Sequence, residues 1–151
     1  MYWIRPQEIL SSESGAHRFL WDMHYTPINV PATYPMTAIY QNTAPSTTSP
    51  WVMPGNYTVK LTANGKTISQ SFSVKMDPRV KSSAADLEKQ FSLSMICYEG
   101  RIKAKAMGSK TLESKFASLL DQLQETEMPP TTQLTLAVKQ LSEQLGQLIK
   151  K

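Results

Sequence analysis

The chain has 151 residues, of which 40% are hydrophobic and 19% are charged, and its formal net charge is +4. This composition is typical of a globular protein and excludes a chain that stays disordered because its hydrophobicity is low. No apolar run approaches the roughly 20 residues that a membrane-spanning helix needs, so no membrane span is expected.

Short strands joined by proline-rich loops are predicted for the first half. The strand candidates before residue 54 are Trp3-Ile4, residues 17–25 and, more weakly, residues 36–41. The second of these alternates in polarity and is expected to bury Phe19, Trp21 and Met23 on one face. The start of the chain lacks a basic region followed by an apolar one, so no secretion signal is expected, and the compartment is not predicted.

A β-hairpin is predicted over residues 54–76. Asn64-Gly65 favours a type I′ turn, which needs two positive φ angles. Pairing outward from this turn sets Ala63 opposite Lys66, Leu61 opposite Ile68, Val59 opposite Gln70 and Tyr57 opposite Phe72. One face is then apolar and consists of Tyr57, Val59, Leu61, Ile68, Phe72, Val74 and Met76. Because a lone hairpin is marginal in water, we expect partner strands or a second sheet to cover this face.

The predicted fold class is α+β. Several short antiparallel strands with long connections suggest a small immunoglobulin-like β-sandwich over residues 1–78. The composition changes at Asp77-Pro78-Arg79, after which leucine, lysine, glutamine, glutamate and alanine dominate. Residues 79–151 are therefore expected to form a helical domain.

Three helices are predicted in that domain, over about residues 83–106, 109–126 and 131–150. Their apolar stripes are Leu87, Phe91, Met95, Tyr98 and Ile102 in the first, Leu112, Phe116, Leu119 and Leu123 in the second, and Leu134, Val138, Leu141, Leu145 and Leu148 in the third. Gly100 and Gly108 mark weak points or a break, and Cys97 is expected in the core. The short Pro129-Pro130 connection predicts an antiparallel hairpin of the last two helices. Its remaining apolar surface must pack on the first helix, on the sandwich or on another copy of the chain.

No pattern of catalytic or metal-binding residues stands out. His17, Asp22 and His24 are the only cluster that suggests a metal, but strand alternation places His17 on the opposite face from the other two. The sequence has no Cys-His pair, glycine-rich phosphate loop or Gly-x-Ser-x-Gly elbow. We therefore expect no enzyme activity, no cofactor and no metal.

The basic excess is interpreted as a solvated face rather than a nucleic-acid site. Its densest part consists of Arg101, Lys103, Lys105 and Lys110, without interleaved aromatic residues to stack on bases. The candidate contacts to a ligand or partner are Trp51, Tyr34 and Tyr40, which lie in or beside the long loops. They can form a platform for a sugar or a peptide, or they can close the ends of the sandwich core.

Two motifs carry a family resemblance, His17-Arg18-Phe19-x-Trp21-Asp22 and Pro54-Gly55-x-Tyr57-Thr58-Val59-x-Leu61. They resemble the C-terminal region of large bacterial proteins with sortilin-like, BNR-repeat β-propellers, often labelled glycosyl-hydrolase-like. More loosely, they resemble the immunoglobulin-like domain of flagellar hook-capping proteins. The resemblance continues through residues 74–80, 84–87 and 129–133. It implies an accessory module that normally stands beside an exported propeller, to which any hydrolase activity would belong.

The sequence thus favours a non-enzymatic structural or protein-interaction module that can self-associate through its helices. Its partner would be another protein or a second copy of the chain. The alternative is a carbohydrate-binding accessory module that uses the loop aromatics.

Overall fold

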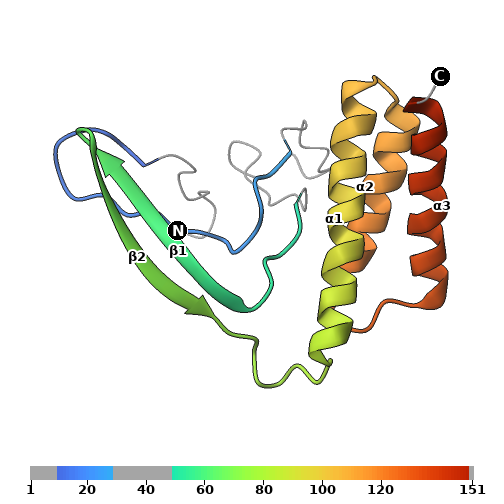
Figure 1. Cartoon of the computed structure of the whole chain (residues 1–151), viewed down its shortest axis with the longest axis horizontal. Coiled ribbons are helices and arrows are strands. Elements are labelled where there is room, and N and C mark those ends of the chain that lie inside the picture. The colour runs from blue at the N-terminus through green and yellow to red at the C-terminus, as the bar shows by residue number, and fades with distance from the viewer. Residues whose placement is uncertain (1–9, 29–48, 150–151) are drawn as a thin grey trace, which may run out of the picture.

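The computed structural model describes residues 10–28 and 49–149 and combines one β-hairpin with three α-helices (Figure 1). The strands are β1 (Gly55–Ala63) and β2 (Lys66–Val74), and the helices are α1 (Ala84–Ala106), α2 (Lys110–Gln124) and α3 (Thr132–Ile149). The predicted α+β class is confirmed, and each helix begins and ends within two residues of its expected bounds. None of these helices is long and apolar enough to cross a bilayer.

The hairpin has the predicted turn and register. Asn64 and Gly65 have φ angles of 50° and 73°, which are the two positive values of a type I′ turn. The paired residues are those expected, from Ala63 opposite Lys66 to Tyr57 opposite Phe72. In Figure 1 the hairpin extends as an arm away from the helices, and among the described residues neither strand lies against a helix.

A complete sandwich is not seen, because the sheet of the described residues has two strands. The strand expected at residues 17–25 is wrong: the only β-structure there is an isolated bridge between His24 and Trp51. The cause is a local bend, in which the Asp22 carboxylate accepts the His24 N–H and Met23 takes a φ of 61°. Phe19 and Met23, expected to be buried, are 49% and 48% exposed. The candidates at Trp3-Ile4 and residues 36–41 lie outside the described residues.

The apolar face of the hairpin is largely open. Val59, Leu61 and Ile68 expose 53%, 50% and 70% of their surface. Trp21 packs on one end of this face, with its ring centroid 5.7 Å from that of Tyr57 and 6.0 Å from that of Phe72. The cover that we expected over the whole face is therefore confined, among the described residues, to the end nearest the helices.

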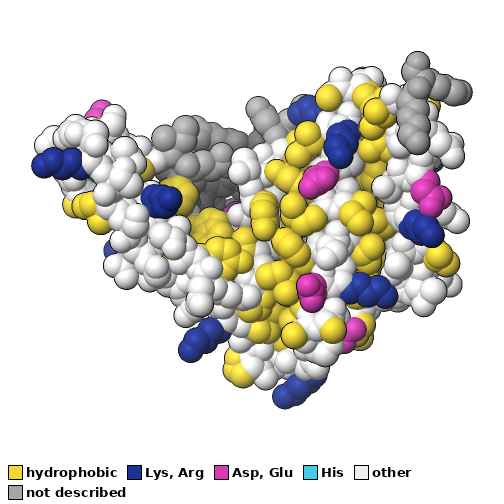
Figure 2. All heavy atoms as spheres, in the orientation of Figure 1, with side chains coloured by type: hydrophobic (Ala, Val, Ile, Leu, Met, Phe, Trp, Pro, Cys, Tyr) yellow, Lys and Arg dark blue, Asp and Glu magenta, His cyan; other side chains and the backbone are white. Residues whose placement is uncertain are grey.

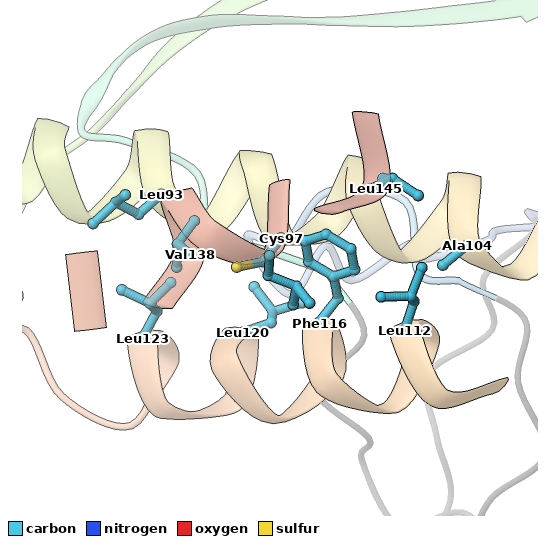
Figure 3. Close-up of a cluster of buried hydrophobic side chains, with 10 residues drawn as sticks. Leu93, Cys97, Ala104, Leu112, Phe116, Leu120, Leu123, Val138 and Leu145 are labelled. Carbon is cyan, nitrogen blue, oxygen red and sulfur yellow. The ribbon is translucent and has the colours of Figure 1, made fainter. Parts of the chain in front are cut away.

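The three helices share one hydrophobic core (Figure 3). Figure 3 shows Cys97 of α1, Phe116 and Leu120 of α2 and Val138 of α3 converging between the helices. The predicted stripes of α2 and α3 are confirmed in large part, although Leu120 rather than Leu119 is fully buried and Leu148 is exposed. The apolar stripes of α2 and α3 therefore pack mainly against other helices of the same chain.

Of the stripe predicted for α1, Tyr98 packs against the core shared by the helices, and Leu87 is buried outside that core. The α1 residues in the shared core are Leu93, Cys97 and Ala104. The predicted stripe instead meets the N-terminal segment, where the Phe91 ring lies 5.7 Å from that of Tyr25 and the Tyr98 hydroxyl donates to the Thr26 carbonyl at 2.8 Å. Helix α1 thus has two apolar faces, and the predicted stripe lies mainly on the one that meets the N-terminal segment, while Tyr98 contacts both that segment and the core.

Gly100 is a close-approach position and not a break in α1. A Cβ atom there would lie 2.5 Å from the Phe116 ring, so glycine allows this ring to pack directly on the α1 backbone. Gly108 does end a helix: its φ is 70°, and its N–H bonds to the Lys105 carbonyl.

We expect Gly100→Ala to destabilise the protein, because overpacking costs about 1–3 kcal/mol whereas alanine gains only about 1 kcal/mol in helix propensity. The matched control is Gly146→Ala in α3, where a Cβ meets nothing within 4 Å. That variant should gain about 0.5–1 kcal/mol. Denaturant unfolding measures both free energies, and an equal gain from the two variants would contradict the close packing of Phe116 on Gly100.

Cys97 is fully buried, as expected, and desolvation raises its pKa from 9.0 to about 12. The unfolded thiol loses its proton above its ordinary pKa while the native thiol keeps it. The contribution of Cys97 to stability is therefore complete below pH 9 and is lost as the pH rises toward 12. Relative to Cys97→Ala, the native protein should lose about 1.4 kcal/mol of unfolding free energy per pH unit in that range. Parallel denaturant curves for the two proteins at alkaline pH would disprove this.

Candidate functional site

The hairpin arm, the N-terminal segment and the helices meet at a short antiparallel ladder, formed by residues 23–25 and 50–52 and here called the junction ladder. The Tyr25 N–H donates to the Pro50 carbonyl at 3.0 Å, and the Val52 N–H donates to the Met23 carbonyl at 2.8 Å. Ser49 adds a hydroxyl bond of 2.7 Å to the Tyr25 carbonyl. The junction ladder leads directly into β1 and so sets where the arm leaves the helices.

A chain of polar contacts, which begins at the surface and ends at the buried Ser94, fixes the junction ladder to α1 and α2. The Trp51 N–H donates to the Gln124 side-chain oxygen at 2.8 Å, and the Gln124 amide nitrogen donates to the Ser94 hydroxyl at 2.8 Å. Ser94, which is fully buried, donates to the Gln90 carbonyl. Since a buried polar group without a partner is costly, each of these side chains restricts the position of the next.

A small cavity, here called the junction cavity, opens beside the junction ladder and has a volume of about 180 Å³. Its wall includes Met23 and Trp51 from the junction ladder, Val74 at the end of β2, Met76 just after it, Phe91 from α1 and Gln124 from α2. Figure 2 shows hydrophobic side chains gathered between the arm and α1. The junction cavity is thus mostly apolar, with a few amide and charged groups at its edge.

Trp51 is the only one of the three predicted contact residues that the structure places. It is 49% exposed, and the His24 ring covers one side of its indole with a centroid distance of 3.7 Å. Tyr34 and Tyr40 lie outside the described residues. A platform built from all three aromatics therefore stays a prediction. Sequence reasoning missed Gln124, because a single glutamine beside an apolar stripe carries no distinguishing signal.

The chemistry available at the surface is limited. Across residues 10–28 and 49–149, no three His, Cys, Asp or Glu side chains come together to hold a metal ion. The His17 imidazole bonds to the Glu13 carbonyl, whereas His24 lies 3.6 Å from the Asp22 carboxylate. The two histidines thus have separate local partners.

A larger hollow of about 630 Å³ lies at the start of α1, next to Asp77, Arg79 and Glu127. The Arg79 guanidinium bonds to the Asp77 carboxylate at 2.6 Å, which holds the pKa of Asp77 below its usual value. The charge of Arg79 is thus neutralised by its neighbour. Both acidic and basic residues line this hollow, so its surface does not carry charge of one sign.

Arg101 corrects the solvated-face interpretation of the basic run. Its side chain is only 11% exposed, its Nε has no hydrogen-bond partner among the described residues, and the Glu113 carboxylate lies 4.0 Å away. Partial burial raises the pKa of Asp121, and the charge of Arg101 opposes that rise. One of the four basic residues is therefore part of the α1–α2 interface.

Comparisons of this chain with protein families, with curated proteins and with solved structures find no match. The resemblance to the propeller-associated region therefore stays a prediction that rests on its sequence motifs.

We expect Gln124→Ala to destabilise the protein by about 0.5–1.5 kcal/mol, because it removes the acceptor of the Trp51 N–H at the junction. Gln122→Ala is the matched control on the same helix, since the amide of this exposed residue makes one long contact of 3.4 Å to Ser118. Denaturant unfolding gives both values, and amide hydrogen exchange should show lost protection at Trp51 in Gln124→Ala alone. Equal effects of the two variants would show that these polar contacts do not hold the junction ladder.

Proposed function

We propose that this chain is a non-enzymatic structural or protein-interaction module whose working surface is the hairpin arm. The observation that carries the proposal is the open apolar face formed by Val59, Leu61 and Ile68. Burial of apolar surface yields about 25 cal/mol per Å², so an open apolar face on a projecting arm favours a protein contact. The three-helix bundle acts as the support from which the arm extends (Figure 1).

The immunoglobulin-like sandwich and self-association through the helices belong to the same proposal. The hairpin would supply two strands of a sandwich, and its open face is the one that a second sheet would cover. On the helices, the large apolar residues left exposed are Ile96, Ile102, Met107, Leu136, Leu148 and Ile149. Because the main stripes of α2 and α3 are already buried within the chain, these residues would have to carry a helical contact between copies.

The test measures how accessible the hairpin face is. Ile68→Cys places a thiol on the apolar face, and the control Thr67→Cys places one on the polar face; native Cys97 is buried and should react slowly in both. In dilute solution we expect both new thiols to react with a maleimide at similar rates. Strong protection of Ile68→Cys in a monomer would show that the chain covers its own face, and it would overturn the proposal.

Self-association is tested by sedimentation velocity over a wide concentration series. If copies pair through the hairpin, rising concentration should slow the labelling of Ile68→Cys while Thr67→Cys stays reactive. If they pair through the helices, the mass should rise with no change in either labelling rate. A strict monomer at the highest concentration excludes self-association and leaves a different protein as the partner.

A carbohydrate-binding module is the second candidate, favoured by the position of Trp51. Its half-exposed indole stands at the edge of the junction cavity near the amides of Gln90 and Gln124, a pairing suited to a sugar ring. The junction cavity is smaller than the 300–1,000 Å³ of usual ligand pockets, so a sugar would stack mainly on the surface. A glycan array with no signal, or with a signal unchanged in Trp51→Ala, would exclude this candidate.

A further inference from the structure

The outer edge of β2 is available for pairing with another strand. A two-residue turn makes Ala63 and Lys66 a hydrogen-bonded pair, and bonded and non-bonded pairs then alternate along the hairpin. Thr58 and Ser71 form a non-bonded pair, so the backbone N–H and C=O groups of Ser71 point away from β1. The Gln70 amide already bonds to the Ser71 carbonyl at 3.2 Å, in agreement with this direction. Within the described residues no third strand occupies this edge.

The same edge leads into the junction cavity. Val74, the last residue of β2, lines the junction cavity together with Lys75 and Met76. Ser71 and Val74 are three residues apart, which is about 10 Å along a strand. A segment that pairs with β2 therefore reaches the junction cavity within a few residues. The volume of about 180 Å³ suits one large apolar side chain and is too small for a cofactor.

The charge of the arm indicates which segment would bind. Between Gly55 and Met76 the sequence has three lysines, at positions 60, 66 and 75, and no acidic residue. All three are exposed. Two copies that paired through their β2 edges would bring like charges together, which is unfavourable for cross-strand neighbours. An acidic segment would instead gain from Lys66 and Lys75, which stand at the two ends of the β2 edge.

We propose that the β2 edge and the junction cavity form one docking site for an extended, acidic segment of a partner protein. The segment adds a third strand along Thr67–Ser73 and inserts one large apolar side chain into the junction cavity. Main-chain bonds give the affinity and the pocket gives the specificity, as in other cases of strand addition. This inference rests on the proposed interaction function, and it names the partner chemistry and the surface.

The probe is a displayed library of random nine-residue peptides selected on the intact chain. We expect the enriched peptides to combine several acidic residues with one aromatic or leucine anchor. The best of them is then synthesised with a fluorescent label, and its Kd is measured by anisotropy. Failure to enrich any peptide, or enrichment of basic or uncharged ones, overturns the inference.

Two matched pairs of variants test the geometry. Ser71→Pro removes an outward N–H of β2 without removing a bond to β1 and should weaken the peptide by about tenfold or more. Thr58→Pro makes the same change at the opposite position on β1 and should leave Kd nearly unchanged. The double variant Lys66→Glu/Lys75→Glu should abolish binding, whereas Lys110→Glu/Lys115→Glu on α2 should not. Circular dichroism and denaturant unfolding confirm that each variant is folded.

The outcomes separate this inference from the proposed function. A selected peptide that binds Ser71→Pro and the wild type equally, while Ile68→Cys stays reactive, shows an interaction module with a different docking site. Protection of Ile68→Cys in the monomer removes the proposed function itself, whatever the peptides do.

Discussion

The packing of Phe116 on Gly100 is the contact from which the rest of the structure is built. It brings α1 and α2 close enough for Leu112, Phe116 and Leu120 to share a core with Cys97 and Ala104. With the two helices this close, the Gln124 side chain of α2 donates to the Ser94 hydroxyl of α1. This pair of polar residues then presents the acceptor that holds the Trp51 backbone. One glycine thus determines both the helical core and the position of the junction ladder.

The elements that were predicted correctly are those whose formation depends on residues close together in the sequence. The Asn64-Gly65 turn defines the register of the hairpin by itself, and the stripes of α2 and α3 have a single apolar face to bury. The core face of helix α1 was harder to predict, because this helix is apolar on two sides. Large residues such as Phe91 and Tyr98 dominated the pattern, while the true core face carries the small residues Cys97, Gly100 and Ala104. Small residues score weakly in a hydrophobic pattern although they decide how closely two helices approach.

The prediction of a strand at residues 17–25 was wrong for a different reason. Its polarity alternates as a strand requires, but an alternating pattern does not reveal a side chain that bonds to its own backbone. Asp22 forms such a bond to the His24 N–H, and Met23 takes a left-handed conformation between them. The junction cavity could not be predicted either, because it depends on four segments that are distant in sequence. Trp51 is the one residue of its wall that the sequence predicts as a contact residue.

The arm and the bundle differ in what stabilises them, and this difference bears on function. The bundle buries most of its apolar stripes, whereas the arm is joined to it by the junction ladder, the Trp51–Gln124 bond and the linker after Val74. The Tyr57 hydroxyl, which donates to the Met53 carbonyl at 2.6 Å, adds a local tie at the base of β1. A two-stranded sheet is marginally stable by itself, so it gains from a strand that adds main-chain hydrogen bonds along its free edge. The arm therefore offers an apolar face and a strand edge that a partner can bury, while the bundle fixes the point from which the arm extends.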